Sequence, residues 1–183
     1  AIKAEEQPDL DVVTFEGAGV RDDETRTYLQ LFENGHRIAA DLIAKGMEPG
    51  DRFAILVQNH PEFIEMMIAA SITACVFVPI DPRTRGDKLA YTINNSSSKG
   101  IYCADYSLAQ VAEIRDKVPD MGWISVMETG EGKSQMATAD VAGAENFADV
   151  IAAPFSEVEV RVKDPQDMLQ IIYTSEIGRA SCR

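Results

Sequence analysis

The central stretch of the sequence reads Arg52-Phe53-Ala54-Ile55-Leu56-Val57. Its near-continuous apolar character is typical of a β-strand that is covered on both faces. Pro61 marks the first turn of a following helix, which Asn59 or His60 would cap. Residues 75–80 form the next predicted strand. A strand, a helix and a second strand in this order predict a parallel pair of strands joined by a crossover helix.

The same alternation of strand and helix extends from this centre in both directions. Upstream, Thr27 and Gln30 have the spacing of a capping box, and they begin a predicted helix that ends at Gly46. We therefore expect an α/β fold with a largely parallel sheet covered by helices. The further predicted strands are residues 10–15, 24–27, 100–103, 123–127 and 167–175, and the further predicted helices are residues 87–94, 107–118 (capped by Ser107 with Gln110) and 140–152.

Composition and charge disfavour several classes of partner. Of the 183 residues, 45% are hydrophobic and 26% are charged, which fits a soluble domain with a buried core. The net charge of -13 disfavours nucleic acids and anionic membrane surfaces. Cys75, Cys103 and Cys182 have neither a paired nor a metal-binding spacing, so a reduced, cytoplasmic setting is expected. No apolar run approaches the roughly 20 residues that span a bilayer.

Two segments could bind phosphate. Residues 130–134 end like a Walker A loop, but Met127 stands where this motif needs its first glycine, so a solvated turn is favoured. In the second segment, a predicted strand delivers the adjacent hydroxyls of Thr174 and Ser175 at its carboxyl end. Ligands of open α/β sheets usually bind at such an end. Short hydroxyl-rich segments after strands are commonly just turns, so Thr174 and Ser175 are a candidate whose value depends on their setting in the rest of the sequence.

The two histidines are given no chemical role. His60 stands at a helix start next to a proline, which is typical of a cap or an exposed turn. His36 falls at the polar boundary of the helix that begins near Thr27, and it is expected at the surface.

Six stretches of the sequence form an ordered series. They are residues 27–28, 46–54, 58–63, 78–83, 89–91 and 167–175. From about residue 10 to residue 175 the chain resembles the amino-terminal part of the adenylate-forming enzymes, because these landmarks stand in the family's order. Within that superfamily, residues 83–91 look most like acyl-CoA ligases of the crotonobetaine/carnitine-CoA ligase type.

The resemblance implies a ligase that uses ATP, Mg²⁺ and coenzyme A. In such an enzyme a small-molecule carboxylate attacks the α-phosphate of ATP and releases pyrophosphate, and the CoA thiol then displaces AMP from the acyl-adenylate. Residues 1–175 would be a partial AMP-binding domain, in which Thr174 and Ser175 match the start of the family's phosphate loop. No catalytic or metal-binding residue is assigned within the chain, which alone is expected to be inactive.

Two other functions stay open at this point. An amino-acid-activating adenylation domain, which transfers its product to a carrier-protein thiol, shares many of the same landmarks. A non-catalytic nucleotide-binding or interaction module is the second alternative. The two are told apart from a CoA ligase by the second half-reaction and by the length of the gene.

The resemblance breaks off after Ser175. The family pattern continues with a Gly/Thr-rich loop, whereas this chain continues with Glu176-Ile177-Gly178-Arg179-Ala180-Ser181-Cys182-Arg183. A carboxylate at Glu176 would repel a triphosphate, and it lacks the positive-φ freedom of glycine. These eight residues also resemble the translation of a sequencing adapter. We therefore expect residues 176–183 to be a non-native tail on a truncated domain.

Overall fold

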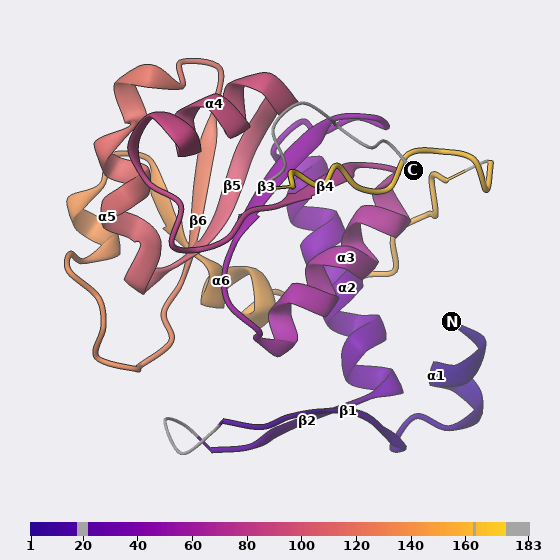
Figure 1. The fold of residues 1–183 in the computed structure, drawn as a ribbon. Coiled ribbons are helices and arrows are strands. Elements are labelled where there is room, and N and C mark those ends of the chain that lie inside the picture. Colours follow the sequence, from indigo (N-terminus) through magenta and orange to yellow (C-terminus); the bar gives the residue numbers. More distant parts are fainter. Residues whose placement is uncertain (18–21, 163, 175–183) are drawn as a thin grey trace.

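A computed structural model describes residues 1–17, 22–162 and 164–174. Its main body is a parallel five-stranded sheet with the strand order β4-β3-β5-β6-β7 (Figure 1). The strands are β3 (Arg52–Leu56), β4 (Val76–Pro79), β5 (Ser98–Ala104), β6 (Trp123–Met127) and β7 (Ala144–Asn146). The predicted α/β fold with a largely parallel sheet is therefore confirmed.

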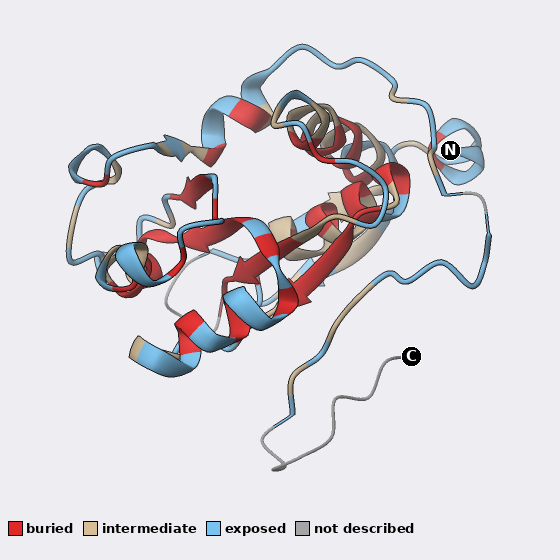
Figure 2. Ribbon diagram, turned by 90° about the horizontal axis from the view of Figure 1, so that it is seen from above, coloured by how far each residue is buried: buried red, intermediate tan, exposed pale blue. Residues whose placement is uncertain are grey.

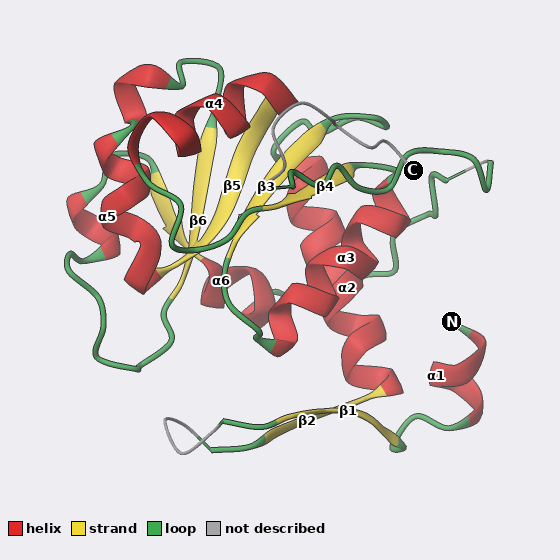
Figure 3. Ribbon diagram, viewed as in Figure 1, coloured by secondary structure: helices red, strands yellow, loops and turns green. Residues whose placement is uncertain are grey.

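Helices cover both faces of this sheet (Figure 3). One apolar cluster joins one face to α2 (Tyr28–Ala44), α3 (Pro61–Thr73) and α6 (Phe147–Ala152), and a second cluster joins the other face to α4 (Gly86–Ser96) and α5 (Asp105–Glu113). Strand β3 contributes Phe53 and Ile55 to the first cluster and Ala54 and Leu56 to the second. Because side chains alternate along a strand, an apolar run of this kind fits a strand buried on both sides.

The amino-terminal segment lies outside this sheet. Helix α1 (Ile2–Glu6) precedes β1 (Asp11–Phe15) and β2 (Glu24–Thr27), which form a separate antiparallel hairpin. The predicted capping box is confirmed, because Gln30 N–H donates to Thr27 Oγ1 at 3.2 Å and Thr27 N–H donates to Gln30 Oε1 at 2.9 Å. The box fixes the point at which the hairpin joins α2.

The predicted start of the helix at Ser107 is wrong. Helix α5 begins two residues earlier, at Asp105, and ends at Glu113, before a short 3₁₀ turn over Arg115–Lys117. The Asp105 carboxylate accepts hydrogen bonds from Tyr106 N–H at 2.8 Å and from the Thr129 hydroxyl at 2.8 Å. Tertiary contact with the segment after β6 therefore outweighs the local capping pattern.

The predicted helix over residues 140–152 is wrong in its first half. The chain there forms a 3₁₀ turn at Thr138–Asp140 and then strand β7, and only Phe147–Ala152 is α-helical. Gly143 has φ +76°, a conformation that interrupts a right-handed helix. Asn146 Oδ1 then accepts from Ala148 N–H at 2.9 Å and caps α6.

The predicted buried strand over residues 167–175 is also wrong for its described part. Residues 168–173 run along the outer edge of β4, where a single isolated bridge joins Gln170 to Phe77. Two hydrogen bonds of 3.0 and 3.1 Å connect Phe77 to Leu169 and Ile171. Leu169 is 38% exposed and Ile172 44%, because this segment has a neighbour on one side only (Figure 2). Ser175 lies outside the described residues.

No helix within the described ranges is long and apolar enough to cross a membrane. Cys75 and Cys103 are buried free thiols, as expected, and Cys182 lies outside the described residues. Burial raises the pKa of the Cys103 thiol to about 12. Both thiols therefore act as small apolar side chains of the core.

The contact between Gly100 and Trp123 provides a test of the sheet packing. A Cβ atom at Gly100 would stand 2.0 Å from Trp123 Cε2, so Gly100→Ala should lower the free energy of unfolding. Overpacking of this kind costs about 1–3 kcal/mol, which urea unfolding would register as a lower midpoint. Gly122→Ala is the matched control, because its added Cβ would meet nothing closer than 3.6 Å. Equal midpoints for the two variants would contradict the described packing.

Candidate functional site

A cleft of about 740 Å³ opens at the carboxyl ends of β3 and β4. Its floor is formed by residues 57–60 and 79–83, which follow those two strands. Its walls come from Glu16 and Gly17 at the end of β1, from Glu131 and Lys133 after β6, and from Ile172. In open α/β sheets, ligands usually bind outside the carboxyl ends of the strands. This cleft is therefore the candidate site, which we call the carboxyl-edge cleft.

Of the two predicted site residues, Thr174 is close in sequence to a residue that lines this cleft. Thr174 is exposed and follows Ile172, which lines the cleft, by two residues. Between them, the Tyr173 hydroxyl donates to Asn95 Oδ1 at 2.7 Å and ties the segment to α4. The second predicted residue, Ser175, lies outside the described residues. Thr174 thus follows a segment that borders the cleft, although it is not itself among the residues that line it.

The cations that line the cleft are already paired with acids. The Arg83 guanidinium donates two hydrogen bonds to the Asp81 carboxylate, from Nη2 to Oδ2 at 2.6 Å and from Nε to Oδ1 at 3.0 Å. Lys133 Nζ lies 2.9 Å from Glu131 Oε2. The Arg83 bonds lower the pKa of Asp81 to about 2. A phosphate ligand would therefore have to compete with these carboxylates or be held by other donors.

His60 lines the cleft and is the N-cap residue of α3, as predicted, but its side chain makes no capping hydrogen bond and is not exposed. Its side chain is 2% exposed, and its Nε2 lies 3.1 Å from the Tyr106 hydroxyl. The same hydroxyl accepts from Gln58 N–H at 2.7 Å. The His60 and Tyr106 rings stack at 6.1 Å with an interplanar angle of 23°. This arrangement fixes the loop after β3. The sequence around His60 could not predict the burial of its ring, because the burial depends on a tertiary contact with α5.

His36 is buried as well, although it was expected at the surface. Its Nδ1 accepts from Val158 N–H at 2.9 Å, and Phe32 packs against the ring at a centroid distance of 4.4 Å. Burial lowers the pKa of His36. The ring lies away from the cleft and joins α2 to the segment after α6, so its role is structural.

Two other candidate features supply no site. The Walker-like residues 130–134 form a turn in which Gly130 and Gly132 both have positive φ and Lys133 is paired with Glu131, as the spacing argument predicted. Among the described residues, no group of three or more His, Cys, Asp or Glu side chains could hold a metal ion.

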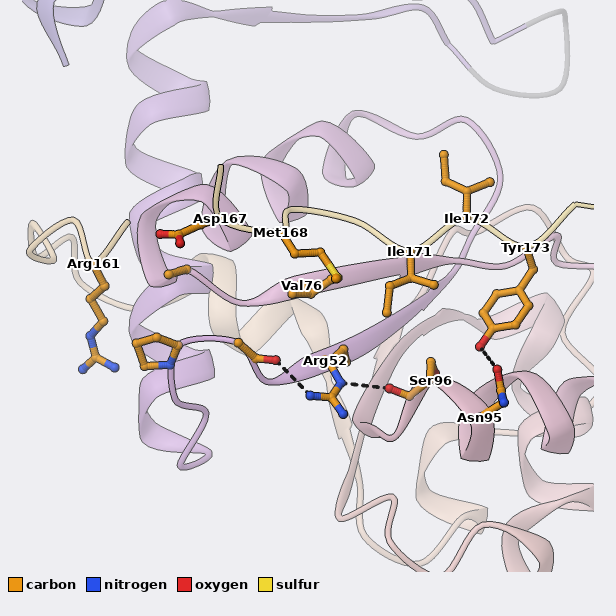
Figure 4. A pocket seen from close by; sticks show the side chains of 13 residues that line it. Arg52, Val76, Asn95, Ser96, Arg161, Asp167, Met168, Ile171, Ile172 and Tyr173 are labelled. Atoms are coloured by element: carbon orange, nitrogen blue, oxygen red, sulfur yellow. Dashed lines mark hydrogen bonds between the residues drawn. The ribbon is translucent and has the colours of Figure 1, made fainter. Parts of the chain in front are cut away.

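A second cavity of about 730 Å³ lies at the opposite end of the strands (Figure 4). It is lined by residues of the 167–173 segment, by the starts of β3 and β4 and by the end of α4. The guanidinium of Arg52 donates to Ser96 O at 2.9 Å and to Gly50 O at 3.1 Å, so its charge is used to hold backbone. The remaining wall includes Val76, Met168 and Ile171.

A family model described as AMP-binding enzyme matches residues 1–175. The chain belongs to the AMP-binding enzyme family. The match covers the hairpin, the five-stranded sheet and Thr174, and it ends at the residue where the sequence leaves the adenylate-forming pattern. The resemblance predicted from the six ordered stretches is therefore confirmed at the level of the family.

Curated relatives in this family include two CoA ligases. The chain is 25% identical over 154 residues to 4-hydroxybutyrate--CoA ligase 2 of Metallosphaera sedula, covering 84% of this chain and 28% of that protein. It is 27% identical over 152 residues to 3-methylmercaptopropionyl-CoA ligase of Ruegeria lacuscaerulensis, covering 82% of this chain and 28% of that protein. The chain thus spans 28% of the length of each of these relatives.

Solved structures support the fold. Acetoacetyl-CoA synthetase from Streptomyces lividans superposes with a TM-score of 0.81 at 18% identity, covering 95% of this chain and 27% of that one. The anthranilate CoA ligase AuaEII, solved in complex with anthranoyl-AMP, gives a TM-score of 0.78 at 16% identity, covering 98% of this chain and 32% of that one. The helix-covered sheet described above is therefore the amino-terminal architecture of adenylate-forming enzymes.

The Asp81–Arg83 pair gives a prediction for the electrostatics of the cleft. The Asp81 carboxyl should titrate near its lowered pKa of about 2 and contribute stability that is lost as the pH falls through that value. Arg83→Met should move the midpoint towards 3.8, the ordinary value, in a carboxyl-carbon NMR titration. Arg85→Met, two residues further along the same loop, should leave the midpoint low. A midpoint that does not respond to Arg83→Met would contradict the assigned pair.

Proposed function

We propose that the chain is the amino-terminal part of an AMP-forming acyl-CoA ligase. The observation that carries the proposal is the family match over residues 1–175 on a chain whose candidate cleft lies at the carboxyl ends of the strands. Two curated relatives in this family are named as CoA ligases. The finer assignment, which rests on residues 83–91, is a ligase of the crotonobetaine/carnitine-CoA ligase type.

The reaction of such a ligase has two steps. A substrate carboxylate attacks the α-phosphate of ATP, forming a C–O–P bond and expelling pyrophosphate. The CoA thiol, losing its proton, then attacks the acyl carbon and displaces AMP. Preorganised donors aimed at the phosphate oxygens would stabilise the first transition state. In this chain Thr174, together with Ser175, is proposed to begin that set of donors.

The described residues offer different numbers of contacts to ATP, Mg²⁺ and coenzyme A. Thr174 offers an exposed hydroxyl for a phosphate oxygen of ATP, whereas Arg83 and Lys133 are exposed and each is paired with a carboxylate. The described residues contain no group of three or more His, Cys, Asp or Glu side chains that could hold a metal ion, and no residue is assigned to Mg²⁺ here. The described residues thus form the floor and walls of a cleft without the full set of phosphate, metal and thiol contacts. We therefore propose that the 183-residue chain alone does not catalyse adenylation.

Amino-acid activation is a second candidate, and one observation favours it. The chain is 29% identical over 116 residues to bacitracin synthase 3 of Bacillus licheniformis, covering 63% of this chain and 2% of that protein. In this alternative the acyl group would pass to a carrier-protein thiol. The buried free thiols of Cys75 and Cys103 suit a reducing compartment in either case, and we propose the cytoplasm.

The proposed activity is tested with the full-length gene product. ATP–pyrophosphate exchange that depends on an added carboxylate should appear in the full-length protein and be absent from the 183-residue chain. Acyl-CoA formation would then identify the CoA ligase, whereas acylation of a carrier protein without acyl-CoA would identify the alternative. Carboxylate-dependent exchange by the 183-residue chain would contradict the proposed inactivity, and no exchange by the full-length protein with a broad acid panel would contradict both candidates.

The proposed boundary at residue 175 has its own test. Genomic sequencing past the codon for Ser175 should give glycine in place of Glu176, followed by a Gly/Thr-rich loop and several hundred further codons. This result is expected because glycine at that place lets backbone N–H groups turn towards a phosphate. A genomic stop codon directly after Arg183 would contradict both the non-native tail and the partial domain.

A further inference from the structure

The β1–β2 hairpin reaches from α2 to the carboxyl-edge cleft. Its base is held by backbone hydrogen bonds, with Tyr28 N–H donating to Leu10 O at 3.3 Å and Leu29 N–H donating to Pro8 O at 3.1 Å. Its other end places Glu16 and Gly17 in the cleft wall. Gly17 N–H donates to Asp23 Oδ1 at 2.8 Å and closes that end. The hairpin is thus an arm that is fixed at one end and forms part of the cleft at the other.

A two-stranded hairpin has little stability of its own in water. Its strands form a sheet separate from the five-stranded one, and β2 is the strand that contacts α2 and α3. In Figure 1 the hairpin extends beyond the lower end of α2. The direction of the arm therefore depends on side-chain contacts between β2 and these helices.

Arg26 supplies those contacts. It lies in β2 opposite Val13, between the fixed base and the cleft end. Its Nε donates to Glu65 Oε1 at 2.9 Å and its Nη2 donates to Glu62 Oε1 at 3.2 Å, both on α3. Nη2 also donates to Glu24 Oε2 at 3.2 Å within the hairpin. A single planar guanidinium thus joins two turns of α3 to the strand that carries it.

The partner of Arg26 is a deeply buried carboxylate. The Glu65 side chain is 1% exposed, and it also accepts from Asn34 Nδ2 on α2 at 2.9 Å. A buried charge is costly unless it is paired and hydrogen-bonded, so this position strongly requires the Arg26 guanidinium. Glu62 is half-buried beside it, and burial raises its pKa. The cluster therefore fixes one orientation of β2 on the helices.

We propose that Arg26 is a positioning residue, which acts through Glu65 and Glu62 to hold the hairpin as a wall of the carboxyl-edge cleft. From Val13, its partner across the hairpin, to Gly17 is about 13 Å at the rise of a β-strand, so a small rotation at Arg26 moves the wall substantially. Breaking the anchor would open the cleft on the hairpin side while the five-stranded sheet stays intact. The proposal rests on the proposed function only in treating the cleft as a ligand site.

The test is a distance measurement across the cleft that needs no ligand. Spin labels at Glu16→Cys and Lys133→Cys, in the 183-residue chain with Cys182→Ser, report the distance between two walls. Cys75 and Cys103 are buried, so they should not take up label. We expect a narrow distance distribution with Arg26 in place and a broad one, shifted to longer distances, in Arg26→Met/Glu65→Gln. The double variant removes the buried charge and so favours a folded domain.

Arg37→Met is the matched control. Arg37 is 17% exposed against 16% for Arg26, and it also pairs with a glutamate, Glu33, but it lies on α2 without a contact to the hairpin among its described bonds. It should leave the distance distribution narrow. An unchanged distribution in the Arg26 double variant would overturn the proposal. The proposal would also be overturned if the double variant lost its whole fold while Arg37→Met stayed folded. Arg26 would then be needed for the stability of the domain and not for the position of the cleft wall.

The distance measurement is independent of the proposed activity. If the full-length protein shows no ligase activity but the wall moves as expected, the proposed function fails and the positioning role stands. If activity is found and the wall does not move, the positioning role alone fails. The two failures are therefore distinguishable.

Discussion

The burial of β3 on both faces is the constraint on which the rest of the structure depends. Phe53 and Ile55 need an apolar layer on one side of the sheet, and Ala54 and Leu56 need one on the other. Parallel neighbouring strands meet this need, because the connection from one strand to the next places a helix over one face of the sheet. The carboxyl ends of β3 and β4 then lie side by side, and the loops that follow them form the carboxyl-edge cleft.

Local signals in the sequence were sufficient where they agreed with this layered arrangement. The Thr27–Gln30 capping box and the apolar strand at Arg52 are short-range patterns, and the structure has both where they were predicted. Prediction failed where long-range contact decided the outcome. Asp105 at the start of α5, for example, is bonded to Thr129, 24 residues further along the chain. The failure at Gly143 is a different, local one, because its positive φ interrupts a segment that otherwise has a helical pattern. Residues 168–173 are apolar like a buried strand, yet they have β4 on one side only.

The candidate site was predictable in part. The family and the location at the carboxyl ends of strands followed from ordered motifs and from topology. The burial of His60 against Tyr106 and the Arg26–Glu65 contact did not, because each joins residues that are far apart in the sequence. Glu65 carried a signal in the sequence. A carboxylate between the apolar Ile64 and Met66 of α3 could have predicted a buried ion pair.

Residue-specific amide hydrogen exchange tests the central role of β3 most directly. Ala54 and Leu56 are buried residues of β3, which lies between β4 and β5, so their amides should exchange only through global unfolding. The amide of Phe77, which donates to Leu169 O at the sheet edge, should exchange faster through local opening of residues 168–173. This ranking is the result the account predicts. Equal or faster exchange at Ala54 and Leu56 than at Phe77 would contradict it.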